Sequence, residues 1–329
     1  MTSALTTMRA IVQDAYGDAE VWSNAEVARP EVRDNEVLVR VHAAGLDRGT
    51  WHVMTGLPYL ARLALGFTKP KNRVPGLDLA GTVEAVGSAV TRFTVGDEVF
   101  GTGRGSFAEY AAAREDKLAR KPVNLTFDQA AVVPVSGLTA IQAVQDHGRV
   151  QPGQRVLVIG ASGGVGSYAV QIAFAARAEV TGVCSASKSG LVRSLGAYNI
   201  LDYAVEDFAD GTQYDVIIDI GGNSALRRLR RALTPKGTLV IVGGEGGGRV
   251  TGGIGRQLRA AVLSMFIRQR LTMLISTENY ADLERLTALI EAGSVIPSID
   301  RAYPLSDAAD AMRHLVAGHA RGKIAITIA

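Results

Sequence analysis

The stretch Val156-Leu-Val-Ile-Gly-Ala-Ser-Gly-Gly-Val-Gly166 decides the fold of this chain. An apolar run ends in a glycine-rich turn, and a segment of helical character follows at once. The spacing Ala161-x-Gly163-x-x-Gly166 matches the G-x-G-x-x-G fingerprint, with alanine at its first position. Small residues let the backbone approach a pyrophosphate, and a helix N-terminus offers free N–H groups and a partial positive charge. The stretch therefore predicts a dinucleotide-binding turn.

The segments around this turn alternate between apolar strands and helices. Such alternation predicts a parallel sheet that is covered on both faces and wound in two directions, because crossovers between parallel strands are right-handed. The fold class is therefore α/β. We expect strands at 155–159, 179–184, 216–220 and 238–242, and helices at 127–133, 138–146, 165–176, 188–195 and 225–233.

The two ends of the chain have a different pattern. Short β-branched runs separated by turn residues precede residue 124, which predicts a mostly β unit. The last residues form a lone strand, which needs a sheet to join. We therefore expect a discontinuous domain of residues 1–133 and 276–329 around an inserted cofactor domain of residues 134–275. Expected strands lie at 10–13, 37–41, 76–86, 95–100, 107–111 and 323–328, and expected helices at 280–292 and 305–317, the second capped at Pro304 to Asp307.

Composition excludes several classes of protein. The 329 residues are 47% hydrophobic and 20% charged, with a net charge of +3, which is typical of a globular chain and too mild to indicate nucleic-acid binding. The single cysteine, Cys184, excludes internal disulfides and fits a reducing, cytoplasmic compartment. No apolar run is long enough for a membrane helix. The longest, residues 260–267, is expected to be a buried segment with solvated ends.

The end of the second strand of the cofactor domain predicts which dinucleotide binds. NAD sites usually carry an Asp or Glu there for the ribose hydroxyls. This chain instead reads Cys184-Ser-Ala-Ser-Lys188, without an acid. Hydroxyls and an ammonium group bind a 2′-phosphate, which a carboxylate would repel. Ser185 and Lys188 therefore favour NADPH, with Lys188 as a merely solvated residue the alternative.

An ordered set of further motifs resembles the medium-chain dehydrogenase/reductase superfamily, in its zinc-free quinone oxidoreductase and enoyl reductase branch. The set comprises Gly76-Leu-Asp-Leu-Ala-Gly81, Val95-Gly-Asp-Glu-Val99, Gly105-Ser-Phe-Ala-Glu-Tyr110, Gly137-Leu-Thr-Ala140, Leu195-Gly-Ala197 and Gly322-Lys323. The resemblance implies a GroES-like β domain, a Rossmann domain and a homodimer that pairs Rossmann domains edge to edge, near the strand at 238–242.

The resemblance also implies positions for the cofactor. Thr139 would lie near the nicotinamide, and Tyr203 would meet the 2′-phosphate beside Ser185 and Lys188. The remaining residues that the resemblance places at the cofactor are Ser162, Gly163, Gly164 and Val165 at the pyrophosphate, Gly221 and Gly222 in a neighbouring loop, Gly243, Gly244, Phe266 and Arg268 over the nicotinamide, and Lys323 late in the chain.

The zinc ligands of the superfamily are missing. The first ligand, a cysteine, is replaced around Leu46-Asp47, and the usual Gly-His-Glu reads Gly76-Leu77-Asp78. A four-cysteine structural lobe cannot exist with one cysteine. Zinc prefers thiolate and imidazole ligands, so we expect no metal. Without a Lewis acid, oxidation of simple alcohols loses its usual driving force.

Chemistry without zinc needs a group that polarises or protonates the acceptor. Asp47 is the best candidate, followed by Tyr59 and His52; Arg48 and Thr50 lie in the same segment. For each of these the alternative is a surface or packing role. Residues 57–73, with aromatic and basic side chains, are equally compatible with a lid over the substrate and with a surface loop.

These observations predict a soluble NADPH-dependent reductase that transfers hydride to a small quinone or α,β-unsaturated carbonyl, with no nucleic-acid or membrane partner. Two alternatives stay open. One is an NADPH-binding protein with little turnover, and the other is a zinc-free alcohol dehydrogenase or carbonyl reductase. Fold alone does not choose among them.

Overall fold

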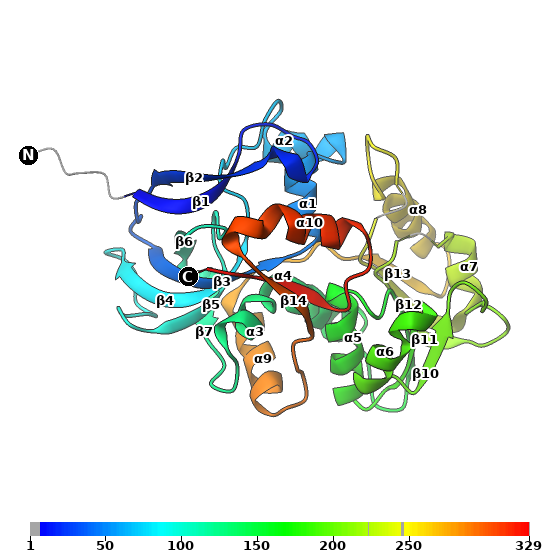
Figure 1. Ribbon diagram of the computed structural model, residues 1–329. Coiled ribbons are helices and arrows are strands. Elements are labelled where there is room, and N and C mark those ends of the chain that lie inside the picture. The colour runs from blue at the N-terminus through cyan, green and yellow to red at the C-terminus, as the bar shows by residue number, and fades with distance from the viewer. Residues whose placement is uncertain (1–6, 223, 245–246, 329) are drawn as a thin grey trace, which may run out of the picture. The chain divides into compact units, whose positions relative to one another are not determined.

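A computed structural model describes residues 7–222, 224–244 and 247–328 of the chain (Figure 1). Their contacts divide the chain into two compact units. Unit 1 takes the described residues of Met1–Val135, Glu278–Glu291 and Pro297–Ala329, and unit 2 takes those of Ser136–Thr277 and Ala292–Ile296.

Unit 2 is built on a parallel sheet, as predicted. Its strand order among the described residues is β10-β9-β8-β11-β12-β13, so the chain starts in the middle and winds outward in both directions. The central strands β8, β9 and β11 are mostly buried on both faces, which explains their continuous apolar runs. Their bounds are β8 Arg155–Ile159, β9 Glu179–Cys184, β10 Asn199–Asp202, β11 Tyr214–Asp219, β12 Leu233–Ile241 and β13 Arg270–Met273.

Helices connect these strands. α5 (Gly164–Ala175) contacts β8 and β9 and is mostly apolar, and it is buried from Gly166 to Ala173. The segment expected as one helix at 138–146 is α4 (Pro134–Ile141) followed by a π-helical stretch, Gln142–His147. The other helices of unit 2 are α6 (Ser189–Ser194), α7 (Leu226–Arg231) and α8 (Ile254–Ser264).

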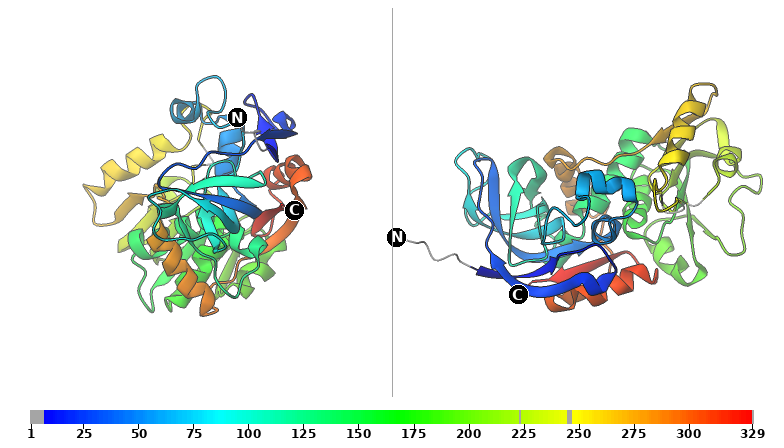
Figure 2. Two further views of the ribbon diagram at one scale, coloured as in Figure 1. Left: turned by 90° about the vertical axis from the view of Figure 1, so that its left-hand side faces the viewer. Right: turned by 90° about the horizontal axis from the view of Figure 1, so that it is seen from above.

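Unit 1 is mostly β, also as predicted. Its large sheet has the order β14-β15-β3-β4-β5-β7, with β6 also paired to β3, and β1 and β2 form a separate hairpin. The C-terminal strand β15 lies antiparallel to β3, so strands from the N-terminal and C-terminal parts of the chain share one sheet (Figures 1 and 2). The strands are β1 Thr7–Gln13, β2 Trp22–Ala28, β3 Glu36–Leu46, β4 Asp78–Val86, β5 Glu98–Thr102, β6 Tyr110–Arg114, β7 Leu118–Arg120, β14 Ile299–Pro304 and β15 Lys323–Thr327.

Helices cover the sheet of unit 1. α3 (Phe127–Ala131) has a capping box between Thr126 and Gln129, and it contacts β3 and β4. The expected cap at 304–307 is wrong, because neither Pro304 nor Asp307 forms a side-chain cap. The other helices are α1 (Arg48–Thr55), α2 (Arg62–Leu65), α9 (Tyr280–Glu291) and α10 (Ala308–Val316).

The expectation of a buried segment at residues 260–267 is wrong. In this segment the side chain of Ala260 is buried, whereas those of Val262, Met265 and Phe266 are 55%, 72% and 78% exposed. The cause is that α8 packs on the core of unit 2 through a narrow stripe, with Leu263 and Ile267 only partly buried there. Hydrophobicity alone cannot tell a core helix from a helix with an uncovered apolar face.

Candidate functional site

The glycine-rich turn lies between β8 and α5 in unit 2. Gly160 has a φ of 88°, which favours glycine, and the N–H groups of Gly160 and Ala161 both donate to the carbonyl of Val183. Gly163 caps α5 in an extended conformation. The first N–H groups of a helix have no intrahelical acceptor, so those of α5 point out of the turn with the positive end of the helix dipole.

Two glycines of the turn differ in the space around them. A Cβ atom at Gly166 would overlap the carbonyl oxygen of Gly160, so only glycine lets α5 pack this close to β8. Gly163, in contrast, has no other protein atom nearer than 3.4 Å to such a Cβ. The backbone is thus open on the side of the helix N-terminus, where a pyrophosphate would bind.

A buried ion pair holds the two neighbouring glycine loops. Asp219 ends β11 with no solvent exposure, and its Oδ2 accepts a hydrogen bond of 2.6 Å from Arg256 Nη1. The same guanidinium donates to the carbonyls of Ser224 and Gly243, and Asp219 Oδ1 accepts from Gly222 N–H. Burial raises the pKa of Asp219, and the charge of Arg256 opposes this. The pair ties both loops to the sheet.

The end of β9 carries the residues predicted for the 2′-phosphate. The hydroxyls of Ser185 and Ser187 lie 3.2 Å apart, and Lys188 begins α6 and is partly exposed. Tyr203 is 67% exposed. Sequence reasoning missed Asp202, which pairs with Cys184 across β10 and β9 and brings a carboxylate near this end. Its Oδ1 accepts a hydrogen bond from Ala204 N–H.

The remaining predicted cofactor residues divide into two groups. Thr139 is buried in α4. The Gly221–Gly222 and Gly243–Gly244 loops follow β11 and β12, so they lie at the carboxyl ends of the strands, as the glycine turn does after β8. Phe266 and Arg268 lie elsewhere, because they come just before β13. Since the strands are parallel, these two residues lie at the amino ends of the strands, opposite to the glycine turn, which does not favour the predicted contact with the nicotinamide.

Unit 1 contains a buried cluster of three ionisable side chains, Asp47, Asp78 and Lys323. Asp78 is fully buried and Lys323 is 2% exposed, with 3.5 Å between Asp78 Oδ2 and Lys323 Nζ. Asp78 Oδ1 accepts a hydrogen bond from Val135 N–H. Lys323, which the resemblance places at the cofactor, therefore lies inside unit 1 with its ammonium group beside a carboxyl group.

Burial dominates the titration of this cluster. The pKa of Asp78 is raised to about 8, with burial as the largest cause; the negative charge of Asp47 contributes to the rise, and the positive charge of Lys323 opposes it. A carboxyl group with this pKa is largely protonated at neutral pH. The cluster thus stores a proton next to a second carboxyl group.

Asp47, a member of this cluster, is hydrogen-bonded to a residue that lines a pocket. Its Oδ1 caps α1 by accepting hydrogen bonds from the Thr50 N–H group (2.8 Å) and the Thr50 hydroxyl (3.1 Å). Its buried Oδ2 has no hydrogen-bond partner among the described residues. Thr50 also lines a pocket of about 260 Å³, whose wall is largely apolar and includes Val53, Leu65, Pro75 and Leu77.

The other two candidate donors have different surroundings. His52 Nδ1 lies 2.7 Å from the carbonyl oxygen of Leu57, so one ring nitrogen is used to hold the end of α1. Tyr59 is 44% exposed and lies under the guanidinium of Arg62. Residues 64, 65 and 70–72 line the same pocket as Thr50, so part of the 57–73 segment contacts it.

The cluster does not suit a zinc ion. The described residues contain no group of three or more His, Cys, Asp or Glu side chains arranged to hold a metal. The only cysteine, Cys184, is buried in β9 of unit 2. The ammonium group of Lys323 lies close to Asp78 and would repel a metal cation bound to that carboxylate.

Comparison with known proteins gives consistent matches. Residues 33–123 match the model of the alcohol dehydrogenase GroES-like domain, and residues 195–326 match that of the zinc-binding dehydrogenase family. The chloroplast envelope quinone oxidoreductase homolog of Arabidopsis thaliana is 32% identical over 97% of this chain and 98% of its own. The NADPH-dependent alkenal/one oxidoreductase of the same plant is 34% identical over 97% of this chain and 79% of its own.

A solved structure agrees with these sequences. The quinone oxidoreductase from Coxiella burnetii superposes with a TM-score of 0.87 at 30% identity, covering 98% of this chain and all of the other. In the part of the chain that the structure describes, no helix is long and apolar enough to cross a membrane. The predicted GroES-like and Rossmann-like domains are confirmed, and the chain belongs to the quinone oxidoreductase branch of the medium-chain dehydrogenase/reductase superfamily.

Proposed function

We propose that this oxidoreductase uses NADPH to reduce a quinone or an α,β-unsaturated carbonyl without zinc. The observation that carries the proposal is the open glycine turn of unit 2. Unit 1, taken by itself, adds a buried acid cluster in which Asp47 bonds to Thr50, a residue in the wall of an apolar pocket. Relatives named quinone oxidoreductase and alkenal/one oxidoreductase support the substrate class.

The dinucleotide would be held by unit 2. Gly163, Gly164 and Val165 offer backbone to the pyrophosphate, and Asp219 with Arg256 fixes the loops beside it. Ser185 and Lys188 suit a 2′-phosphate through hydroxyl and ammonium donors. When bound, the reduced nicotinamide supplies the hydride.

The acceptor would lie in the pocket that Thr50 lines. Reduction of an enone or a quinone leaves a negatively charged oxygen, which needs a proton. The Thr50 hydroxyl, which donates its hydrogen to Asp47 Oδ1, would turn to donate that proton to the product oxygen and would take a replacement proton from solvent. Asp78 keeps a proton in the cluster, and Lys323 limits the cost of ionising it. This route requires no metal.

Lys188 tests the dinucleotide preference. We expect Lys188→Ala to raise the KM for NADPH about tenfold and to leave the KM for NADH within about twofold, because only NADPH carries the phosphate that the ammonium group binds. Steady-state kinetics with both cofactors measures the difference. Lys236→Ala removes an exposed lysine elsewhere in unit 2 and should change neither constant. Equal losses for both cofactors would contradict the assignment.

A panel of acceptors tests the reaction. NADPH oxidation would be followed with a benzoquinone, a naphthoquinone, a linear enone, a simple ketone and, in the reverse direction with NADP⁺, a simple alcohol. We expect turnover of a quinone or the enone. Tight NADPH binding without turnover of any acceptor would support a binding protein instead. Oxidation of the alcohol would support an alcohol dehydrogenase.

We also propose a homodimer. One edge strand of the sheet in unit 2 is β13, which lies beside β12, the strand that the resemblance put close to the dimer edge. An open strand edge beside the exposed apolar face of α8 favours pairing with a second copy. Sedimentation velocity should give the mass of a dimer, and a monomer at micromolar concentration would contradict this.

The single cysteine continues to favour a cytoplasmic location, which fractionation of the source cells would check.

A further inference from the structure

Unit 1 carries an exposed apolar surface in the segment that follows α1. Residues 59–71 form a 3₁₀ turn, the short helix α2 and a loop, and α2 lies at the periphery of unit 1 in Figure 1. The side chains of Leu60, Leu63 and Phe67 are 43%, 70% and 76% exposed. The backbone stays helical from the 3₁₀ turn into α2, so Leu60 and Leu63, which are three residues apart, lie on one side of it.

Phe67 extends this surface from a closed loop. The N–H group of Lys71 donates to the carbonyl oxygen of Leu65 at 2.8 Å, which brings the two ends of the loop together. The turn is tight, because Gly66 has a φ of 123° and a Cβ atom there would overlap the carbonyl oxygen of Lys69. Phe67 and Lys69 therefore lie in one short exposed turn directly after α2.

Positive charge accompanies these apolar side chains. Residues 48–77 contain five Lys and Arg side chains and no Asp or Glu, although the net charge of the whole chain is only +3. Arg73 is engaged by Asp14 at 2.7 Å. Lys69 and Lys71 are exposed, and neither forms an ion pair with the described residues. We call Leu60, Leu63, Phe67, Lys69 and Lys71 the apolar-basic patch.

The apolar-basic patch adjoins the pocket in which the acceptor would lie. Ala64 and Leu65 line that pocket, and so do Pro70 and Lys71 at the end of the loop. Residues of this one segment thus contribute both to the pocket wall and to the exposed surface. A lipid layer that covered the patch would therefore lie next to the pocket.

We propose that the apolar-basic patch docks unit 1 on an anionic lipid surface, from which a lipid-dissolved quinone enters the pocket. Exposed apolar side chains bury area at the headgroup boundary, and lysines are attracted to anionic lipids. The neighbouring pocket favours lipid over a protein partner, because small apolar quinones dissolve in lipid. Such docking needs no helix that spans the bilayer, so the prediction of no membrane partner, which rested on the lack of one, does not exclude it. The docking stands by itself, whereas the entry of the quinone rests on the proposed function.

Cosedimentation of the full-length protein with phosphatidylglycerol vesicles, and with phosphatidylcholine vesicles in parallel, tests the docking. We expect binding to the anionic vesicles that weakens as salt rises. Leu63→Ser/Phe67→Ser should weaken it about tenfold or more, because less apolar area enters the lipid. Both side chains are largely exposed, so the variant should fold. The matched control, Val123→Ser/Tyr198→Ser, removes two side chains that are 87% and 77% exposed and should bind as the natural chain does.

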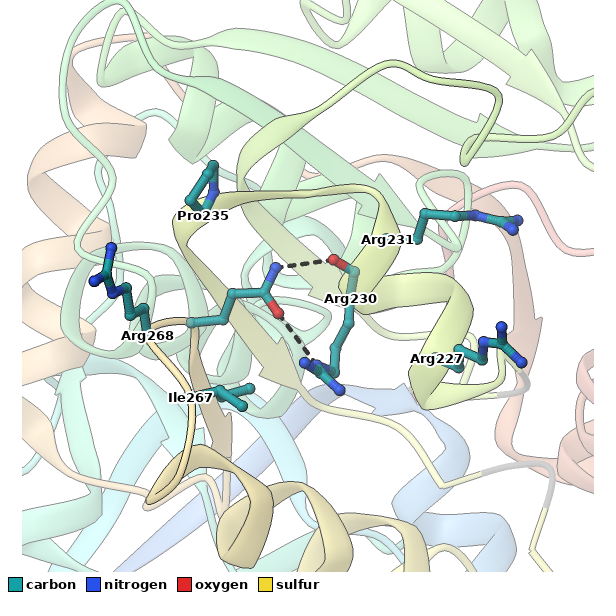
Figure 3. A pocket seen from close by; sticks show the side chains of 7 residues that line it. Arg227, Arg230, Arg231, Pro235, Ile267 and Arg268 are labelled. Carbon is teal, nitrogen blue, oxygen red and sulfur yellow. Dashed lines mark hydrogen bonds between the residues drawn. The ribbon is translucent and has the colours of Figure 1, made fainter.

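Lys69→Glu tests the electrostatic attraction. It should weaken binding about tenfold, and Arg227→Glu should weaken it no more than about twofold. Arg227 is a demanding control, because it lies among other arginines of unit 2 whose side chains point away from one another (Figure 3). Equal losses in these two variants would show attraction by overall charge alone and would overturn the docking. No binding by the natural chain, or unchanged binding by Leu63→Ser/Phe67→Ser, would overturn it as well.

NADPH oxidation tests the entry of the quinone. A quinone with a long isoprenoid chain would be supplied in the phosphatidylglycerol vesicles, and a water-soluble benzoquinone in solution. Leu63→Ser/Phe67→Ser should lower the rate about tenfold with the vesicle quinone and leave the rate with benzoquinone unchanged. Equal rates for this variant and the natural chain with the vesicle quinone would contradict entry from lipid. No turnover of either quinone, with vesicle binding intact, would contradict the proposed reductase and not the docking.

Discussion

Gly166→Ala is expected to destabilise the protein by about 2 kcal/mol and to weaken NADPH binding at least about tenfold. The added methyl would overlap the carbonyl oxygen of Gly160 and crowd the backbone of Ala161. Neither is a flexible side chain, so α5 must move away from β8. The N–H groups at the start of α5 then lose their position for the pyrophosphate. Thermal unfolding and fluorescence titration with NADPH measure both effects.

Gly190→Ala is the matched control for this substitution. Gly190 lies in the first turn of α6, and a Cβ atom there would meet no other atom within 4 Å. Alanine favours a helix over glycine, so we expect equal or slightly higher stability and unchanged binding. If Gly166→Ala bound NADPH as well as Gly190→Ala does, the glycine turn would not be the pyrophosphate site.

Asp78 is expected to make the protein less stable as pH rises, by about 3 kcal/mol between mildly acidic and alkaline solution. Its folded-state pKa of about 8 lies above the ordinary value of 3.8, so the folded chain holds this proton more tightly than the unfolded chain. The stability that the proton contributes is complete below the unfolded pKa and is lost as pH rises through the folded pKa. Denaturant unfolding at several pH values measures the slope.

Two variants isolate this contribution. Asp78→Asn keeps the shape of the protonated carboxyl group and should flatten the pH dependence of the free energy of unfolding. Lys323→Met removes the one cation that favours ionised Asp78, so its cost should grow from about pH 6 to about pH 9. A slope in Asp78→Asn equal to that of the natural chain would show that other groups cause the pH dependence.

The sequence predicted the sheet of unit 2 because its strands are continuous apolar runs separated by helices. It also predicted that the C-terminal strand would join a sheet of the N-terminal β unit, as β15 does beside β3. It did not predict β10 and β13. Both are only four residues long, and both pair through their backbones with a neighbouring strand that the local pattern does not reveal.

The sequence predicted the part of the candidate site that one continuous stretch forms. It did not predict the parts that depend on contacts between residues far apart in the sequence. The glycine turn is one continuous stretch, so its spacing was enough to locate it. The pairing of Asp78 with Lys323 and of Asp219 with Arg256 joins residues 245 and 37 positions apart, which no local motif shows. The resemblance placed Arg268 at the cofactor, whereas the strand order puts it at the ends of the strands opposite to the glycine turn, which does not favour that contact.

The most direct test of the account is NADPH oxidation by protein that has been treated with a strong chelator, dialysed and analysed for bound zinc. A naphthoquinone and a linear enone would serve as acceptors, with NADH in parallel. We expect full turnover of at least one acceptor with NADPH at a zinc content far below one ion per chain. Activity that disappears with the chelator and returns with added zinc would contradict it.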